Sequence, residues 1–460
     1  MINYFNFKEF GNSFLITNDL GRYSFVDASD LKELITGSGR FSEEKTAELH
    51  DKAFIYELSD EFSDIRIGEM RDSKSYLFNA TGLHIFVLTN QCNHACVYCQ
   101  ASAGISKKNF MDAETAEHAV DIALSSPNPY LSFEFQGGEP LLNYGTLQHI
   151  VEYAENKATG KDIDFSVVTN LSLITDEMIR FFIDHHVNVS TSLDGPEKLH
   201  NKNRPFSNGA ASYRMVSDAI KHLQDSGLNV GAIQTTTRYS LPFAEEIVDD
   251  YFEKGLKNIF VRPLTPLGAA GKIWNRIGYT SEEFCHFYEK VLQYVIDMNK
   301  EGTSMVENHA AIFLSKILHG YGKNYMELRS PCGAGFGQAA YYPDGGVYTC
   351  DEGRMLHEMG NDSFRIGDVY KDTYEKIMCS PGCRACAVSS LLESIPGCCD
   401  CVYQPYCGVC PVINLALDGD IIPNRPNNWR CRIYSGMLDS IFRILKRNDT
   451  AEMNILDKWA

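Results

Sequence analysis

The sequence contains no long apolar run. No stretch approaches the roughly 20 consecutive apolar residues that an α-helix needs to cross a bilayer. The first residues, MINYFNFKEFGNSF, also lack the basic start and apolar stretch of a secretory signal. We therefore expect a protein that stays in the cytoplasm and has no membrane partner.

Positive charge is scarce as well. The 42 Lys and Arg residues are outnumbered by 60 Asp and Glu residues, which gives a formal net charge of -18. This surplus repels phosphate backbones at long range, so nucleic acid is not expected as a partner. Hydrophobic residues make up 44% of the 460-residue chain, which is too many for a disordered protein. The length allows a catalytic core with appended domains.

Cysteine is absent from the first 91 residues and then occurs in two groups. Of the 15 cysteines, three fall at 92–99, Cys285 stands alone, and the other eleven lie between Cys332 and Cys431. A reducing cytosol does not favour a disulfide framework, so metal or cluster ligation is the leading account of both groups. Cys285 lies in an amphipathic helical segment and is interpreted as core packing.

Runs rich in β-forming residues alternate with amphipathic segments between residue 83 and about residue 300. We expect strands at 83–90, 130–136, 164–170, 187–193, 229–237 and 258–264, with helices between them. Six such βα units predict an α/β fold with a parallel sheet, in the form of a partial (β/α)6 barrel of the TIM type. The predicted domains are a small one over residues 1–80, the barrel over 81–305 and a cysteine-rich domain over 306–460.

The predicted N-terminal domain is a winged-helix-like module. NSFLITN and RYSFVDA predict a pair of strands. SDLKELITG predicts a helix with Asp30 as its N-cap and Gly37 as its C-cap. SEEKTAELHDKAFI would add a second helix.

Small and polar residues follow four successive strands of the predicted barrel. In such barrels the chemistry collects at the carboxyl ends of the strands. The first thiol group follows the first strand, GGEP (137–140) follows the second, and TNLS (169–172) and SLDG (192–195) end the third and fourth. The two glycines allow a ligand close to the backbone, and Glu139 offers a carboxylate to an ammonium group.

The spacing C-x3-C-x2-C in CNHACVYC gives the first thiol group only three members. A structural zinc ion needs four ligands, and the nearest further candidate, His94, lies inside the loop between two of the cysteines. A [4Fe–4S] cluster is normally held by four thiolates, so three thiolates leave one iron open to another ligand. We favour the cluster with an open iron.

Together these motifs resemble a radical S-adenosylmethionine (radical SAM) enzyme. The resemblance implies that Cys92, Cys96 and Cys99 hold three irons while SAM chelates the fourth. The residues that would bind SAM by this resemblance are Gly137, Gly138, Glu139, Asn170, Ser172, Ser192 and Arg204. Reduction of the cluster, by a partner such as flavodoxin or ferredoxin, would cleave SAM and give a 5′-deoxyadenosyl radical that removes a hydrogen atom from the substrate.

The second thiol group is similar to a SPASM domain, which carries two auxiliary [4Fe–4S] clusters in many peptide-modifying radical SAM enzymes. The pattern is C-x12-G-x4-C from Cys332 to Cys350, C-x2-C-x5-C-x2-C from Cys398 to Cys410, and a final Cys431. Its last short interval is x2 where x3 is usual. The resemblance implies one cluster on Cys398, Cys401, Cys407 and Cys431, and most of another on Cys332, Cys350 and Cys410.

The second of these clusters lacks a ligand in the usual position. No cysteine stands shortly before Cys332. The cluster is therefore either open to substrate or completed by Cys379, Cys383 or Cys386.

A finer resemblance, through phrases such as PYCGVCPV and RPLTPLGAA, is to the radical SAM maturase of the His-Xaa-Ser peptide system. It implies an enzyme that oxidatively modifies side chains of a ribosomally made precursor peptide, by C–C or thioether cross-linking. The N-terminal module would grip the precursor as a β-strand added to an edge strand such as NSFLITN.

Two alternatives stay open. One is an anaerobic maturase that forms formylglycine from Cys or Ser in a protein, for which Asp351, next to Cys350, would deprotonate the substrate by resemblance to the sulfatase-maturating relatives. The other belongs to a different class, an iron–sulfur electron-transfer or binding protein. GGEP and the six βα units argue against it, because an electron carrier needs no SAM pocket.

We predict three [4Fe–4S] clusters, or roughly twelve irons per chain. Replacing Cys92, Cys96 and Cys99 by Ala should remove about four of these irons, because only one cluster loses its thiolates. Iron analysis together with detection of 5′-deoxyadenosine tests this, and all SAM cleavage should be lost. Loss of every cluster, or SAM cleavage that survives, would contradict the assignment.

Overall fold

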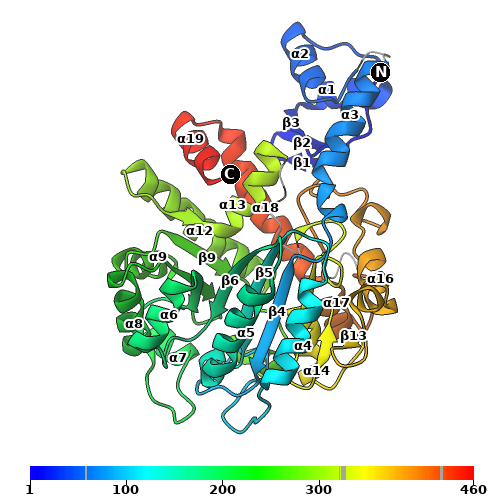
Figure 1. Ribbon diagram of the computed structural model, residues 1–460. Helices are drawn as coiled ribbons and strands as arrows, with labels where there is room; N and C mark the ends of the chain where they lie inside the picture. Colours follow the sequence, from blue (N-terminus) through cyan, green and yellow to red (C-terminus); the bar gives the residue numbers. More distant parts are fainter. Residues whose placement is uncertain (57–59, 321, 323–327, 425–427) are drawn as a thin grey trace.

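The computed structural model describes residues 1–56, 60–320, 322, 328–424 and 428–460. Its described strands form a three-stranded sheet and a ten-stranded sheet. Figure 1 shows the larger sheet surrounded by helices, with the N-terminal sheet at one end of the molecule. Within the described ranges, no helix is long and apolar enough to cross a membrane.

The larger sheet contains all six predicted barrel strands. They are β4 (Leu83–Thr89), β5 (Tyr130–Gly137), β6 (Asp162–Val168), β7 (Val187–Ser192), β8 (Val230–Thr235) and β9 (Asn258–Arg262). Each pairs in parallel with the next one along the chain. The predicted α/β fold with a partial barrel is therefore confirmed.

Helices lie between these strands and after the last of them, and several begin at a capping side chain. They are α4 (Ala113–Leu124), α5 (Tyr144–Lys157), α6 (Asp176–Asp184), α7 (Glu197–Asn203), α8 (Tyr213–Asp225), α9 (Ala244–Glu253), α10 (Gly268–Lys272), α11 (Trp274–Ile277) and α12 (Ser281–Lys300). Asp112 caps α4 and Thr175 caps α6. Thr280 and Glu283 form a capping box at the start of α12, which satisfies backbone N–H groups that the helix leaves unpaired.

The sheet continues beyond the barrel on both sides. β10 (Val306–Glu307) pairs in parallel with β9, and β11 (Gln338–Tyr341) pairs in parallel with β4. β12 (Gly346–Tyr348) and β13 (Arg365–Asp368) follow in antiparallel order. The cysteine-rich region therefore shares one sheet with the barrel, and the boundaries at residues 80 and 305 stay predictions.

The remaining helices belong to the cysteine-rich region and the C-terminus. They are α13 (Asn308–His319), α14 (Asp351–Glu358), α15 (Tyr374–Met378), α16 (Pro381–Ser389), α17 (Pro411–Asp418), α18 (Trp429–Arg447) and α19 (Thr450–Trp459). The side chain of Cys285 in α12 lies against α18, with its Sγ 3.8 Å from the carbonyl oxygen of Ile433. This confirms the interpretation of Cys285 as core packing.

The N-terminal sheet has one strand more than predicted. It contains β1 (Asn6–Phe10), β2 (Ser13–Thr17) and β3 (Tyr23–Val26) in that order, followed by α1 (Ala28–Thr36), α2 (Glu43–Asp51) and α3 (Asp60–Ser73). NSFLITN forms the central strand β2, which pairs with a strand on both sides. The prediction of NSFLITN as an edge strand is therefore wrong, because the preceding NFKEF already occupies that edge.

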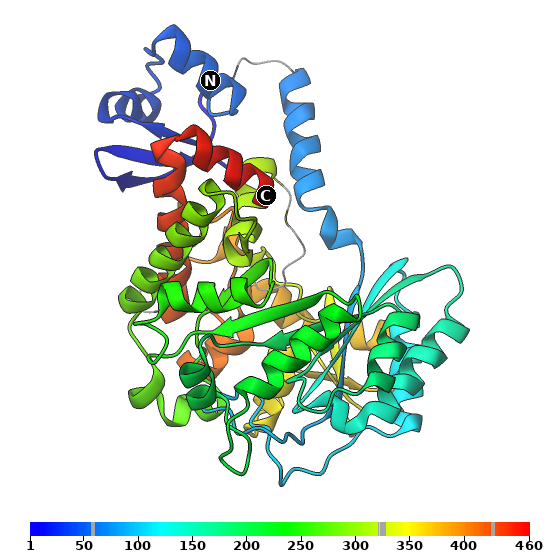
Figure 2. The ribbon, with the colours of Figure 1, turned by 90° about the vertical axis from the view of Figure 1, so that its left-hand side faces the viewer.

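The N-terminal sheet packs on the C-terminal part of the chain. Thr17 donates a hydrogen bond to the carbonyl oxygen of Val402 at 2.7 Å, and Tyr406 donates one to the carbonyl oxygen of Gly21 at 2.9 Å. The rings of Tyr23 and Phe442 meet edge to face at 5.3 Å. Figures 1 and 2 place this module at the opposite end of the larger sheet from the loop that follows β4.

The N-cap of α1 is Asp27 and not the predicted Asp30. The Asp27 carboxylate accepts hydrogen bonds from the backbone N–H groups of Ser29 and Asp30, both at 2.8 Å. The chain thus enters the helix one turn earlier than the sequence pattern indicates. Gly37 ends α1 in the left-handed conformation, with φ 70°, as predicted.

We predict that Asp27→Ala destabilises α1 by about 1 kcal/mol, because it removes the N-cap. Amide hydrogen exchange within α1 should then be about fivefold faster than in the unmodified protein. Asp30→Ala is the matched control and should leave this exchange nearly unchanged. A larger effect from Asp30→Ala would contradict the assigned cap.

Candidate active site

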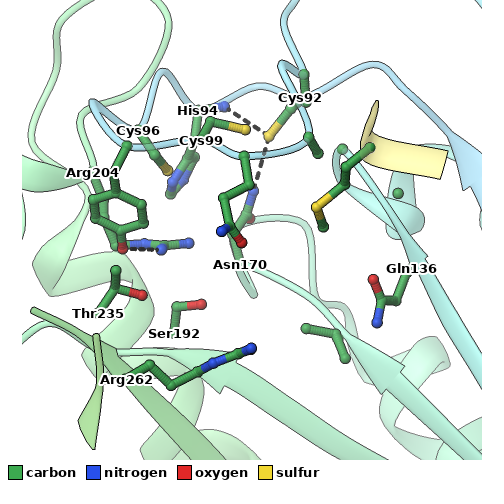
Figure 3. Close-up of a pocket in the computed structure, with 18 of the residues that line it drawn as sticks. Cys92, His94, Cys96, Cys99, Gln136, Asn170, Ser192, Arg204, Thr235 and Arg262 are labelled. Atoms are coloured by element: carbon green, nitrogen blue, oxygen red, sulfur yellow. Dashed lines mark hydrogen bonds between the residues drawn. The ribbon is translucent and has the colours of Figure 1, made fainter. Parts of the chain in front are cut away.

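A cavity lies at the carboxyl ends of the barrel strands (Figure 3). Its wall includes the three thiols of the first group, which lie in the loop after β4. The wall also includes five residues that the sequence predicts to bind SAM, namely Gly137, Gly138, Asn170, Ser192 and Arg204. Arg262 lines the cavity as well and was not predicted. The structure therefore brings the three thiols and five of the seven predicted SAM-binding residues to one cavity.

Among the thiols of this cavity, Cys92 is buried, and Cys96 and Cys99 are partly buried. Burial raises the pKa of Cys92 to about 12, and the neighbouring Cys96 adds to the effect. Burial also raises the pKa of Cys96 to about 11, although Arg204 opposes the shift. A buried thiolate is stable only beside positive charge, which iron ions would supply. The donor set therefore fits an iron–sulfur cluster.

The arrangement of these thiols differs from that of the ligands of a single metal ion. No three His, Cys, Asp or Glu side chains in the described part of the chain are grouped so that they could hold a single metal ion. Thiolates that hold an iron–sulfur cluster each bind a different iron, so they are spaced more widely than the ligands of one ion. The loop also supplies weak hydrogen bonds to sulfur, since the backbone N–H of His94 lies 3.4 Å from Cys92 Sγ.

Gly137 and Gly138 join the end of β5 to the loop that carries the thiols. The N–H of Gly138 donates to the carbonyl oxygen of Thr89 at 2.7 Å, and the N–H of Glu139 donates to that of Gln91 at 2.8 Å. A Cβ on Gly137 would lie 2.3 Å from the Thr89 oxygen, and one on Gly138 would lie 2.2 Å from the Gln91 oxygen. Only glycine permits this close approach of the two backbones.

Glu139 lies behind the cavity wall and is fully buried. Its carboxylate accepts hydrogen bonds from the Thr169 hydroxyl at 2.6 Å and from the backbone N–H groups of Asn170 and Leu141 at 2.8 and 3.0 Å. Burial raises its pKa, and these hydrogen bonds oppose the shift. Glu139 therefore fixes the backbone of Asn170, and its predicted contact with SAM stays a prediction.

Asn170 and Ser172 are linked to the thiol loop by side-chain hydrogen bonds. Asn170 Nδ2 donates to Asn93 Oδ1 at 2.9 Å and lies 3.9 Å from Cys92 Sγ. Asn93 Nδ2 in turn donates to Ser172 Oγ at 2.7 Å. Ser172 does not line the cavity, so the structure gives it a supporting position beside Asn170.

Arg204 reaches the cavity from the residue that ends α7 and is held by a buried chain of hydrogen bonds. Its Nη1 donates to the Tyr98 hydroxyl at 2.6 Å, and that hydroxyl donates to the Asp194 carboxylate at 2.8 Å. Burial alone would lower the pKa of Arg204, but Cys96, Tyr98 and Asp194 raise it well above its usual value. Arg204 thus provides a fixed positive charge beside the thiols, suited to a carboxylate.

Several cavity residues were not predicted. Gln136, Thr235 and Arg262 lie at the ends of β5, β8 and β9, so the rule that located the other strand-end residues would also have found them. Figure 3 shows the side chain of Arg262 extending toward the cavity from the strand opposite the thiol loop. Met355 comes from α14 in the cysteine-rich region, and no local pattern in the sequence indicates its position.

The predicted catalytic residue Asp351 lies next to this cavity and does not line it. It is the first residue of α14, and its carboxylate accepts a hydrogen bond from Arg354 Nε at 2.7 Å. Arg354 is buried and also donates to Gln136 Oε1 at 3.3 Å. Asp351 is therefore connected to the cavity wall through one arginine, and its catalytic role stays a prediction.

The structure also gathers the second thiol group. Cys398, Cys401, Cys407 and Cys431 line a smaller hollow of their own, as the predicted ligand set requires. Cys332, Cys350 and Cys410 lie in a separate buried cluster. Burial raises the pKa of Cys407 to about 12, so this thiol too needs positive charge to ionise.

Comparison with known proteins agrees with this geometry. Residues 86–260 match the model of the radical SAM superfamily. The radical SAM cyclopropyl synthase TigE of Paramaledivibacter caminithermalis is 26% identical over 51% of this chain and 50% of its own. A cysteine-type anaerobic sulfatase-maturating enzyme of Clostridium perfringens is 23% identical over 64% of this chain and 86% of its own. An uncharacterized protein of Methanocaldococcus jannaschii is 31% identical over 40% of this chain, which spans 62% of that relative.

Two groups of solved structures share the fold. Native anSMEcpe with bound AdoMet superposes with a TM-score of 0.69 and 19% identity, over 82% of this chain and all of that one. Streptococcus suis SuiB bound to S-adenosylmethionine superposes with a TM-score of 0.57 and 16% identity, over 94% of this chain and all of that one. The predicted family is thus confirmed by the parallel sheet, the cysteine loop and the family match, which together show that residues 86–260 of this chain are a radical SAM domain.

Proposed function

We propose that the protein is a radical SAM enzyme that oxidatively modifies side chains of a ribosomally made precursor peptide, by C–C or thioether cross-linking. The observation that carries this proposal is the cavity in which three thiols, the strand-end glycines and the charged Arg204 meet. A reduced [4Fe–4S] cluster with SAM bound supplies a 5′-deoxyadenosyl radical that can remove a hydrogen atom from an unactivated carbon.

The side chains of the cavity would bind and orient SAM. Cys92, Cys96 and Cys99 would hold the cluster, and Arg204 carries the positive charge that a SAM carboxylate needs. Ser192 and Asn170 offer hydrogen bonds from neighbouring strand ends. Two auxiliary clusters on the second thiol group would take up an electron from the substrate.

A peptide substrate is supported by the relatives that share the fold. SuiB has been solved with the precursor peptide SuiA, and anSMEcpe with the Cp18Cys peptide. An oxidative cross-link balances when the substrate loses one hydrogen atom to the radical and then one proton and one electron. The product therefore carries two hydrogens fewer per modification, and SAM is consumed as a co-substrate.

Formylglycine formation from Cys or Ser is the second candidate. The position of Asp351 favours it, because Arg354 links its carboxylate to Gln136 in the cavity wall. A base at this point would remove the proton from the substrate hydroxyl or thiol. The two candidates differ in product. Formylglycine is an aldehyde that reacts with a hydrazide probe, whereas a cross-linked peptide does not react with it.

The N-terminal module is the proposed handle for the precursor. Since β2 is paired on both sides, an added strand would pair with β1 or β3, the outer strands of the small sheet. Backbone hydrogen bonds would supply the affinity of such a complex. The electron donor would be a flavodoxin or ferredoxin.

We predict that Glu139→Gln weakens SAM binding at least about tenfold. The substitution replaces one carboxylate oxygen by an NH2 group, which faces the hydrogen-bond donors of Thr169 and Asn170 and cannot accept from them. Equilibrium dialysis with SAM measures this, and the visible absorption of the clusters should be unchanged. Glu307→Gln is the matched control.

Glu307 is equally buried, caps α13 and accepts hydrogen bonds from Tyr288, Ala310 and Val261, but it does not line the cavity. Its replacement should leave the affinity for SAM unchanged. An unaltered affinity in Glu139→Gln, or an equal loss in both variants, would remove Glu139 from the SAM site.

We predict that deleting residues 1–80 abolishes modification of the precursor peptide while slow, uncoupled SAM cleavage persists. The reason is that the deletion removes β1 and β3 and leaves the cavity residues in place. Mass spectrometry of the peptide and detection of 5′-deoxyadenosine measure the two activities. Iron analysis is the necessary control, because the module packs against the segment that contains Cys401 and Cys407.

Two outcomes would contradict the cross-linking proposal. The first is normal modification of the full-length precursor by the truncated enzyme. The second is a product of unchanged mass, as in an epimerisation.

A further inference from the structure

The auxiliary cluster predicted on Cys332, Cys350 and Cys410 is one ligand short. A [4Fe–4S] cluster fully held by protein needs four thiolates. The nearest cysteine before Cys332 is Cys285, whose thiol is packed between α12 and α18 against Gly436. A fourth protein ligand must therefore come from a different part of the chain.

Cys386 in α16 lies where this ligand is needed. It is fully buried and belongs to the same buried cluster as Cys332, Cys350 and Cys410, none of which is more than 4% exposed. The Thr349 hydroxyl lies 3.7 Å from Cys350 Sγ and is also close to the Cys386 thiol. One hydroxyl thus lies near two of the four thiols.

Backbone hydrogen bonds hold the four segments together. The N–H of Cys332 donates to Ser390 Oγ at 2.9 Å, and that hydroxyl donates to the carbonyl oxygen of Cys386 at 2.6 Å. The N–H of Gly335 donates to the carbonyl oxygen of Thr349 at 2.7 Å, which ties the loop after Cys332 to the residue before Cys350. Both α14 and α16 pack against α17, whose N-cap is Cys410.

The other two cysteines of this segment are engaged elsewhere. Cys383 lies one turn before Cys386, but its Sγ donates to the carbonyl oxygen of Ile377 at 3.4 Å and belongs to the main core of the protein. It also fills the space beside Gly335, where a Cβ would lie 2.6 Å from its sulfur. Cys379 is exposed at the end of α15.

Two helix starts support negative charge at this cluster of thiols. Cys350 is the N-cap of α14, and its sulfur accepts a hydrogen bond from the N–H of Gly353 at 3.3 Å. Cys410 occupies the same position on α17. Backbone N–H groups at a helix start stabilise a thiolate, so these two cysteines are suited to metal ligation.

We infer that Cys332, Cys350, Cys386 and Cys410 together hold one auxiliary [4Fe–4S] cluster, with every iron bound by the protein. This inference rests on the proposed function, because it assumes that the second thiol group carries clusters. It also decides between the two possibilities left by the sequence, since a cluster with four thiolates has no open iron for a substrate. Such a cluster can only exchange electrons.

The test uses the full-length protein with Cys92, Cys96 and Cys99 replaced by Ala, so that only the auxiliary clusters contribute to the spectra. In this parent we expect about eight irons per chain and an electron paramagnetic resonance spectrum that added imidazole does not change. Adding Cys386→Ala should remove about four irons or create a spectrum that shifts with imidazole, because one iron is then open.

Cys383→Ala in the same parent is the matched control, since Cys383 is also buried and lies in the same helix. This control variant should have the same iron content as the parent, and added imidazole should not change its electron paramagnetic resonance spectrum. The inference is overturned if Cys386→Ala behaves like the parent, or if Cys383→Ala loses the cluster in its place.

A measurement on the parent alone covers the case in which Cys386→Ala does not fold. If imidazole shifts the parent spectrum, an iron is already open and the four-thiolate set is wrong. A parent without any iron would refute the auxiliary clusters themselves, and with them this part of the proposed function, whereas the other contrary results refute only the role of Cys386.

Discussion

The parallel pairing of β4 with a strand on each side positions the sites of this protein. On one side β4 pairs with β5, which ends in the glycines that contact the thiol loop. On the other side it pairs with β11, the first strand of the cysteine-rich region. Because β4 itself leads into the loop of Cys92, this loop lies between β5 of the barrel and the cysteine-rich region, and residues of both surround it. A break in either pairing would displace the cavity wall.

Helix α14 connects the auxiliary thiols with the cavity. Its N-cap is Cys350 and it contributes Met355 to the cavity lining, and five helical residues span about 8 Å along the axis. Arg354 lies between these two residues and binds both Asp351 and Gln136. One short helix therefore has a proposed auxiliary ligand at its N-cap and a residue of the cavity wall about one and a half turns later. This closeness suits the transfer of an electron out of the cavity.

Much of the radical SAM domain could be predicted from the sequence, because its signals are local. A β-rich run and the glycine pair or thiol motif that follows it together occupy only about ten residues. The β-rich runs alone predict all six barrel strands. The position of Arg262 follows from the same rule. By contrast, the choice of Cys386 among Cys379, Cys383 and Cys386 and the position of Met355 depend on contacts between distant segments, which no local pattern indicates.

The N-terminal errors have a related cause. In NFKEF the polar Asn6 is buried and the apolar Phe7 is exposed, so the residues lack the apolar–polar alternation that predicts a strand. Once β1 is present, β2 changes from an edge strand to a central one. The sequence predicts Asp30 as the N-cap of α1, whereas the structure has Asp27. Both residues are acceptable N-caps, and the choice depends on where β3 ends.

The position of the N-terminal module limits the kind of substrate that it could bind as the proposed handle. The module lies at the end of the larger sheet opposite the thiol loop, where it packs on α18 and on the segment around Tyr406. β4 alone has seven residues and spans about 23 Å, so a peptide bound at β1 or β3 needs at least about seven extended residues to pass the sheet. A precursor with a leader well separated from its modified core meets this requirement. A short motif in a folded protein does not, and such a substrate would have to enter the cavity without using the module.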